Sequence, residues 1–177
     1  MGIDDLNHQQ QMSGLPNKQP ISHLTKDEQI AVIFDRVAAY NQTHDTSKPL
    51  FFDTETIGGG REDQIIEIAF CDSDRHVIID TLIYTDRPSS PGAFKVHGIH
   101  PHELIDKPTF IDIQPAIVQL LKGRTLYAYN ANFDIRMMRQ SGHKLRLQQV
   151  GIKCLCKQFA DFIGQYSPYF KKKQPLL

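Results

Sequence analysis

The pattern of hydrophobic and polar positions changes period twice along the chain. Residues 25–40 open with the T-x-x-E pattern of a capping box and continue with apolar residues at helical spacing, which predicts a helix. A polar stretch ends it, and the pattern then becomes that of β-strands in three runs, at residues 49–52, 64–70 and 76–84. The short polar connections between the runs indicate an antiparallel meander.

Helical spacing returns after residues 85–108, a Pro-, Ser- and His-rich stretch that we expect to be a loop. The next helix is predicted to have Asp112 as its N-cap, Pro115 in its first turn and Gly123 as its stop. A strand, a helix, a strand and a helix then follow at residues 125–129, 132–142, 152–156 and from Lys157 onward. Three meander strands followed by alternating helices and strands indicate an α/β fold, with a mixed sheet flanked by helices.

Composition adds bounds on the class of protein. The 177 residues are 40% hydrophobic and 23% charged, which is ordinary for one globular domain. The Gln-, Asn- and Pro-rich residues 1–24 are expected to be a flexible arm before a domain at residues 25–177. No apolar run reaches membrane-spanning length, and the three cysteines form no even framework, so we expect a cytoplasmic protein with reduced thiols.

A formal net charge of zero argues against a protein that holds nucleic acid through a broad basic surface. An enzyme whose positive charge comes from bound metal ions remains compatible with this balance. The charge therefore directs attention to residues that could bind metal.

The run "LFFDTET" ends a strand of buried character with two carboxylates, Asp53 and Glu55. Positions two apart on a strand face the same way, so the like charges lie side by side at the edge of the core. A divalent cation would relieve this cost, since hard ions take carboxylate oxygens as ligands. A bare D-x-E pattern is common, however, and taken alone it is typical of a solvated strand end.

A second stretch, "YNANFD", places Asp134 just inside a predicted helix that follows a buried strand. Asp134 could serve as a helix cap, but Asn130 and Asn132 could cap instead and leave it pointing elsewhere. If the strands before Asp53 and Asp134 are neighbours in the sheet, all three carboxylates converge at one end of it. Such a cluster favours metal-assisted phosphoryl chemistry.

These motifs carry a family resemblance. "FDTET" followed by "YNANFD", with "VHGIHPHEL" and "KPTF" between them, resembles the DEDD family of 3′–5′ exonucleases, from about Thr25 to the last residue. The family includes the proofreading subunit of bacterial replicative polymerase, and the chain is most similar to its short bacterial, plasmid and prophage members. The resemblance implies a ribonuclease H-like fold and hydrolysis at DNA 3′ ends, single-stranded or frayed, with release of nucleoside monophosphates.

The resemblance also assigns roles to residues. It implies Asp53, Glu55 and Asp134 as catalytic residues that bind two ions of Mg²⁺ or Mn²⁺. Asp53 and Glu55 would ligate one ion directly, Asp53 would bridge to the second, and Asp134 would hold the second through water. The residues implied at the nucleotide are Thr56, His97, Asn130 and Phe133.

The family's third motif, a general-base His or Tyr with a fourth metal-binding Asp, has no match in this sequence, where no acidic residue follows Asp161. The resemblance therefore implies a chain truncated before that motif, with its C-terminal helix missing and little activity. A catalytically inactive relative that binds a nucleic-acid end or a polymerase partner is the alternative from another class. An exoribonuclease is a further alternative, because RNA-specific members share the motifs.

Other chemical groupings favour ordinary structural interpretations. His97, His100 and His102 lack a zinc-ligand spacing, which favours a substrate-facing loop. Cys154 and Cys156 are expected to alternate in a strand, and Glu67 to lie at a strand edge or pair locally. The lysines at 171–173 are interpreted as a solvated run, with phosphate contact as the alternative.

Overall fold

The computed structural model of the protein describes residues 23–147, 149–163, 166–167 and 172–173. All but the last two residues of the arm predicted for residues 1–24 lie outside this part of the chain. Of the lysine run at residues 171–173, the structure describes only the backbone of the last two residues.

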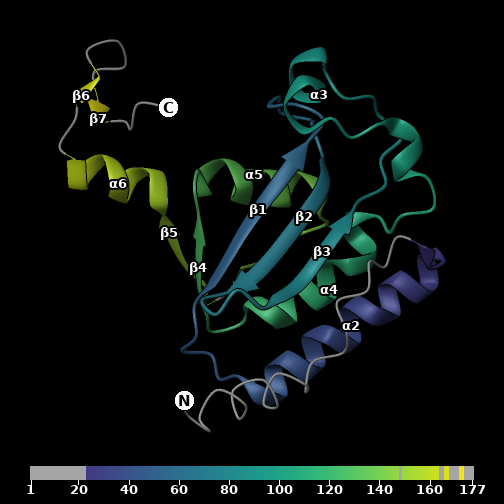
Figure 1. Cartoon of the computed structure of the whole chain (residues 1–177), viewed down its shortest axis with the longest axis horizontal. Coiled ribbons are helices and arrows are strands. Elements are labelled where there is room, and N and C mark those ends of the chain that lie inside the picture. Colours follow the sequence, from purple (N-terminus) through teal and green to yellow (C-terminus); the bar gives the residue numbers. More distant parts are fainter. Residues whose placement is uncertain (1–22, 148, 164–165, 168–171, 174–177) are drawn as a thin grey trace, which may run out of the picture.

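A mixed sheet of five strands, in the order β3–β2–β1–β4–β5, forms the centre of the fold (Figure 1). β1, β2 and β3 form an antiparallel meander, whereas β4 lies parallel to β1 and β5 parallel to β4. The five strands are β1 (Leu50–Thr56), β2 (Ile65–Asp72), β3 (Val77–Leu82), β4 (Thr125–Ala128) and β5 (Gly151–Cys154). A separate two-stranded sheet pairs β6 (Tyr166–Ser167) with β7 (Lys172–Lys173). The predicted meander with added parallel strands is confirmed.

Helices surround this sheet unevenly. They are α2 (Lys26–Thr43), α3 (Pro91–His97), α4 (Phe110–Leu121), α5 (Ala131–Ser141) and α6 (Leu155–Ile163), with the 3-10 helix η3 (Pro101–Leu104). In Figure 1, α4 and α5 lie behind the sheet, α2 packs against α4 and β3, and α6 lies beyond the β5 edge. The core fills the space between the sheet and α2, α4 and α5, and includes Val37, Leu50, Phe70, Ile117 and Met138. Among the described helices, none is both long and apolar enough to cross a membrane.

The predicted loop at residues 85–108 contains two short helices. The Ser90 hydroxyl accepts a hydrogen bond from the amide of Ala93 (3.2 Å), and Pro91 occupies the first turn, where its missing N–H costs nothing. Gly98 ends α3 with a φ of 69°, in the left-handed region that glycine tolerates. The loop prediction was wrong because these start and stop signals outweigh the low hydrophobicity of the stretch.

α4 begins three residues earlier than predicted. Thr109, not Asp112, is the N-cap, and the Asp112 carboxylate reaches back to the amide of Thr109 (2.8 Å) in a second capping box. Pro115 therefore lies inside the helix and not in its first turn.

Other boundaries also differ from the predictions, and two of them matter here. α2 continues past Tyr40 to Thr43, and β5 ends at Cys154. Cys156 consequently lies on α6, so the two cysteines do not alternate on one strand. The change of element between them explains the error, since a strand of four residues leaves no room for both.

Asp72, the last residue of β2, is the centre of a buried polar network at the end of the sheet where β1 begins. Its Oδ1 accepts hydrogen bonds from the amides of Asp74 (2.8 Å) and His76 (3.0 Å). Its Oδ2 accepts from the Tyr40 hydroxyl (3.2 Å) and lies 3.3 Å from the Lys48 ammonium. Burial alone would raise the pKa of Asp72, but the donors on His76 and Asp74 and the Lys48 ammonium lower it to about 2.

Replacing Asp72 with asparagine is expected to remove a pH-dependent part of the stability. Because the folded pKa lies below the ordinary value of 3.8, this stability is fully present above about pH 4 and is lost as the pH falls through about 2. The difference corresponds to roughly 2 kcal/mol. Urea unfolding of the wild type should show this loss, and the Asp72→Asn variant should show a shallower one. Asp74→Asn, at a carboxylate 58% exposed, is the control; equal pH slopes in wild type and Asp72→Asn would contradict the assignment.

Candidate active site

Asp53 and Glu55 lie on the less buried face of β1, with Asp53 exposed and Glu55 half-buried. Burial raises the pKa of Glu55, the charge of Asp53 raises it further, and His97 opposes the shift. Within the described part of the chain, neither carboxylate has an ion-pair partner. The strand therefore presents two like charges that form no ion pair with any described residue.

Asp134 reaches the same end of the sheet from α5. β4 runs parallel to β1, with Leu50 opposite Leu126, so the turn after β4 starts α5 beside the carboxyl end of β1. Asp134 is only 4% exposed. Burial raises the pKa of its carboxyl, and the charges of Asp53 and Glu55 contribute in the same direction. The three carboxylates are therefore close enough to influence one another's ionisation, as the neighbouring strands predicted.

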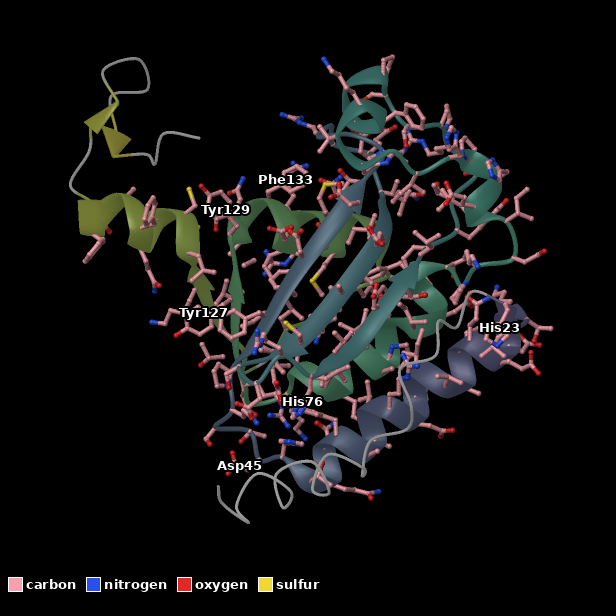
Figure 2. All side chains as sticks on the ribbon, viewed as in Figure 1. His23, Asp45, His76, Tyr127, Tyr129 and Phe133 are labelled. Atoms are coloured by element: carbon pink, nitrogen blue, oxygen red, sulfur yellow. The ribbon has the colours of Figure 1, made fainter. Side chains whose placement is uncertain are left out.

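A pocket of about 360 Å³ opens beside Glu55. The glycine turn after β1 forms part of its lining and α3 another part, and Thr56, His97 and Phe133 also line it. Figure 2 shows Phe133 near the carboxyl end of β1, with His76 at the opposite end of the sheet. The fold therefore brings together one carboxylate and three of the four residues implied at the nucleotide.

His97 has a defined ring orientation in this pocket. Its Nδ1 accepts a hydrogen bond from the amide of Ile99 (2.9 Å), so the proton of the neutral ring is on Nε2. That Nε2 atom is buried and has no partner among the described residues. A buried N–H without a partner is unusual and favours a ligand group as its acceptor.

Asn130, the remaining residue implied at the nucleotide, lies on a neighbouring pocket with Asn132 and Lys153. It occupies the N-cap position of α5, but its side chain makes no capping hydrogen bond. Its carbonyl accepts the amides of Phe133 (2.8 Å) and Asp134 (3.4 Å) instead. The side-chain cap considered for Asn130 is therefore not formed.

Thr54 is a site residue that sequence reasoning missed. It lies between the two carboxylates but on the buried face of β1, and its hydroxyl donates a hydrogen bond to Asp134 Oδ1 (2.8 Å). The available signal was a polar residue at an inward position of a buried strand. This contact fixes one oxygen of Asp134. Thr54, on β1, therefore orients a carboxylate that comes from α5.

A valine at position 54 keeps the shape of the side chain and removes this donor. We expect Thr54→Val to weaken Mn²⁺ binding, measured by calorimetry, by about tenfold, because losing a hydrogen bond to a charged group costs roughly 1.5–3 kcal/mol. Thr54→Ser retains the hydroxyl and should bind Mn²⁺ within about twofold of the wild type. Unchanged binding in the valine variant would show that Asp134 needs no orienting partner.

Glu67 does not lie at an edge or pair locally, contrary to the prediction. It lies within the internal strand β2, directly opposite Glu55 in the strand register. Burial raises the pKa of Glu67, and the charges of Asp80 and Glu55 add to the shift. The register, which sequence alone did not define, places a further carboxylate on the acidic face.

Among the described residues, one histidine-containing group has donor atoms placed so that it could hold a metal ion, and it does not include His97. The group whose donor atoms lie within 4.8 Å of one another is His44, Asp72 and His76, not the histidines near His97. The Lys48 ammonium already lies 3.3 Å from Asp72 and supplies the cation there. The Lys48 ammonium therefore balances the charge of Asp72, whereas Asp53 and Glu55 have no ion-pair partner among the described residues.

The donor set at the end of β1 suits a hard divalent cation. Asp53, Glu55 and Asp134 offer carboxylate oxygens, the ligands that Mg²⁺ and Mn²⁺ prefer. Two of these groups have a raised pKa, first through burial and then through mutual repulsion, and a bound cation would reverse both effects. The residues present therefore fit the implied metal ions.

Comparison with protein families matches residues 50–167 to the exonuclease (RNase T) family model. An uncharacterised exonuclease of Escherichia phage 186 is 29% identical over 124 residues, which cover 66% of this chain and 64% of that protein. DNA polymerase III subunit epsilon of Treponema pallidum is 42% identical over 91 residues, covering 49% of this chain and 42% of the subunit. The chain thus spans less than two thirds of the length of these relatives.

Solved structures show the same fold. Exonuclease I of E. coli in complex with a dA16 oligonucleotide superposes with a TM-score of 0.56 at 22% identity, covering 66% of this chain and 29% of that one. Exonuclease X in complex with 5′ overhanging duplex DNA gives 0.51 at 29% identity, covering 67% and 66%. The predicted ribonuclease H-like fold is confirmed.

Proposed function

Because the chain belongs to the exonuclease family, whose members are metal-dependent hydrolases acting on nucleic-acid ends, we propose that it removes nucleotides from DNA 3′ ends and releases nucleoside 5′-monophosphates. Single-stranded or frayed ends are the proposed substrate. One observation carries the proposal: three carboxylates cluster at the end of β1, and one of them, Glu55, lines a pocket in which the buried His97 Nε2 has no partner among the described residues.

The positions of the carboxylates support the roles that the resemblance implies for them. Asp53 and Glu55, on the same face of β1, would hold one divalent ion, and Asp53 and Asp134 would together hold a second. The proposed ions are Mg²⁺ or Mn²⁺, which when bound would supply activation of the attacking water and stabilisation of the leaving 3′ oxygen. Thr54 keeps Asp134 oriented throughout.

The pocket residues are proposed to hold the terminal nucleotide. Phe133 offers a ring on which a base can stack, a contact worth about 1–3 kcal/mol per base. The Nε2–H of His97 can donate to an oxygen of the sugar or phosphate. Thr56, on the same pocket, and Asn130, on the neighbouring one, are proposed as further contacts to the nucleotide.

We further propose that turnover by this chain is slow. Among the described residues beyond Asp134, Asp161 on α6 is exposed and lines the pocket of Asn130 rather than that of Glu55. No histidine or tyrosine accompanies it at the spacing of the family's third motif. A positioned base contributes about 10²–10⁴-fold, so its absence leaves water activation to the ions.

The same observation favours a second candidate, a relative that binds a nucleic-acid end or a polymerase partner without hydrolysis. The relative from Treponema pallidum is named as a polymerase subunit, which makes a polymerase partner the specific form of this proposal. Hydrolysis of RNA is the corresponding variant of the catalytic proposal.

Polarity separates these proposals. A single-stranded DNA labelled at its 5′ end should yield a ladder that shortens over time with Mg²⁺ or Mn²⁺, and the same DNA labelled at its 3′ end should release labelled mononucleotide first. Loss of the 5′ label as mononucleotide would refute 3′–5′ action. Tight binding with no product at any metal concentration would support the non-catalytic candidate, and faster cleavage of an RNA of the same sequence would support the exoribonuclease.

A further inference from the structure

The turn that follows β1 contains three consecutive glycines, which have no side chains of their own to restrict its conformation. Residues 57–60 have the sequence Ile-Gly-Gly-Gly, which predicts a flexible connection. In the structure, Gly58 and Gly59 line the pocket beside Glu55 together with Phe133. The conformation of this turn therefore determines the width of the proposed nucleotide pocket.

Two side chains of α5 bind the backbone of this turn. Arg136 donates from Nη1 to the carbonyl of Gly60 (3.0 Å) and from Nη2 to the carbonyl of Gly59 (3.2 Å). Gln140 donates from Nε2 to the carbonyls of Gly60 (3.1 Å) and Asp63 (2.9 Å). The Gln140 Oε1 in turn accepts a hydrogen bond from Arg136 (2.7 Å), so the two side chains form one connected brace.

The same guanidinium also contacts the aromatic lining of the pocket. Arg136 lies over the Phe133 ring, 5.2 Å from its centroid. The backbone of Gly59 approaches this ring closely, since a Cβ built there would lie 3.7 Å from Phe133 Cε2. One charged group thus holds both the backbone and the ring that border the pocket.

We propose that Arg136 is a positioning residue that holds the glycine turn and Phe133 in the binding-competent arrangement and thereby sets the affinity for the terminal nucleotide. The identity of the ligand rests on the proposed function; the brace itself does not. Without the brace, the three glycines would populate many conformations, and the apparent affinity would fall in proportion to the fraction that still forms the pocket. Arg136 acts through the turn and makes no contact with the carboxylates in this arrangement.

The test compares Arg136→Met and Arg136→Lys with Arg139→Met. Arg139 is exposed one turn further along α5, so its substitution removes the same charge from the same helix without touching the turn. Lysine keeps the charge but cannot bind two carbonyls in a fixed fork, so it should rescue only in part. Gln140→Ala, which removes the other half of the brace, is a second variant for use if Arg136→Met folds poorly.

The first measurement is amide hydrogen exchange over residues 57–64 in the free protein. We expect exchange to become about tenfold faster in Arg136→Met, with α5 itself and Arg139→Met unchanged, because the turn would form the braced state only about a tenth of the time. Equal exchange in Arg136→Met and wild type would overturn the brace, whatever the protein acts on.

The second measurement is the affinity for deoxynucleoside 5′-monophosphates in the presence of Mg²⁺, by calorimetry. Arg136→Met should bind about tenfold more weakly than the wild type, Arg136→Lys should be intermediate, and Arg139→Met should match the wild type. In exonuclease assays the loss should appear mainly in KM. Equal affinity in Arg136→Met and wild type would refute the positioning role alone, whereas a wild type that binds no mononucleotide would contradict the proposed function as well.

Discussion

Replacing Asp53 with asparagine should reduce metal-dependent nuclease activity by roughly a thousandfold or to background, the largest catalytic effect we expect from a single substitution. The change keeps the size of the side chain but removes the negative charge that the proposed metal ligation needs. Loss of several kcal/mol of metal-mediated stabilisation of the transition state corresponds to about this factor. Initial rates on a 5′-labelled single strand at saturating Mg²⁺ or Mn²⁺ measure it.

The matched control for this variant is Asp35→Asn, which removes the same charge from an exposed position on α2. It should retain wild-type activity. Asp53 is exposed, so its substitution should also leave the unfolding temperature in the absence of metal nearly unchanged. Full activity in Asp53→Asn, with metal still required, would place the metal site elsewhere.

The largest expected effect on stability comes from Arg124, whose side chain is 2% exposed. Its guanidinium donates to the carbonyls of Leu120 (3.1 Å) and His44 (2.9 Å) and to Asn41 Oδ1 (3.1 Å), and also to carbonyls of the loop after α2. It lies 5.1 Å from the centroid of the Tyr40 ring. One side chain thus connects the C-terminal ends of α2 and α4 to the segment just before β1, the strand that carries Asp53 and Glu55.

Arg124→Ala should lower the free energy of unfolding by about 3–5 kcal/mol, because it leaves several buried carbonyls without donors and opens a cavity. That is a large part of the total stability of a typical domain, about 5–15 kcal/mol. Urea unfolding measures the change, and Lys122→Ala, at an exposed position two residues earlier, should alter it by less than about 0.5 kcal/mol. A loss below about 1 kcal/mol for Arg124→Ala would mean that water satisfies the carbonyls.

The features that the sequence predicted correctly are local or follow from strand order. The capping box of Thr25 and Glu28 forms as expected, and the short connections of the meander produce the antiparallel pairs. The proximity of Asp134 to Asp53 and Glu55 followed from one condition, that their strands are neighbours, and the parallel pairing of β1 with β4 fulfils it.

The starts of α3 and α4, which were predicted wrongly, both carry local capping signals. The T-x-x-D pattern at Thr109 and Asp112 is the same signal that correctly located α2, and the Ser-Pro pair at 90–91 is a helix start. The prediction for α4 followed hydrophobic spacing instead, and the prediction for residues 85–108 followed loop-like composition. They show that capping chemistry locates helix starts better than periodicity does in this chain.

The contacts that complete the site depend on distances between elements, which periodicity does not contain. In the sequence, Thr54 is an ordinary strand residue. Its role depends on α5, which places Asp134 Oδ1 2.8 Å from its hydroxyl. From the sequence, Arg136 has the pattern of a solvent-exposed helix residue. Its role depends on the packing of the glycine turn against α5. Arg124, in a short turn between α4 and β4, has a neighbourhood that suggests exposure, and only the packing of α2 against α4 encloses it.

Counting bound Mn²⁺ tests the central claim most directly, namely that Asp53, Glu55 and Asp134 form a divalent-metal site. Paramagnetic resonance of free Mn²⁺ during a titration gives the number of ions per chain and their affinity without requiring turnover. The wild type should bind at least one ion per chain, and the triple variant Asp53→Asn, Glu55→Gln, Asp134→Asn should bind none in the same concentration range. Equal binding by the two proteins would contradict the account.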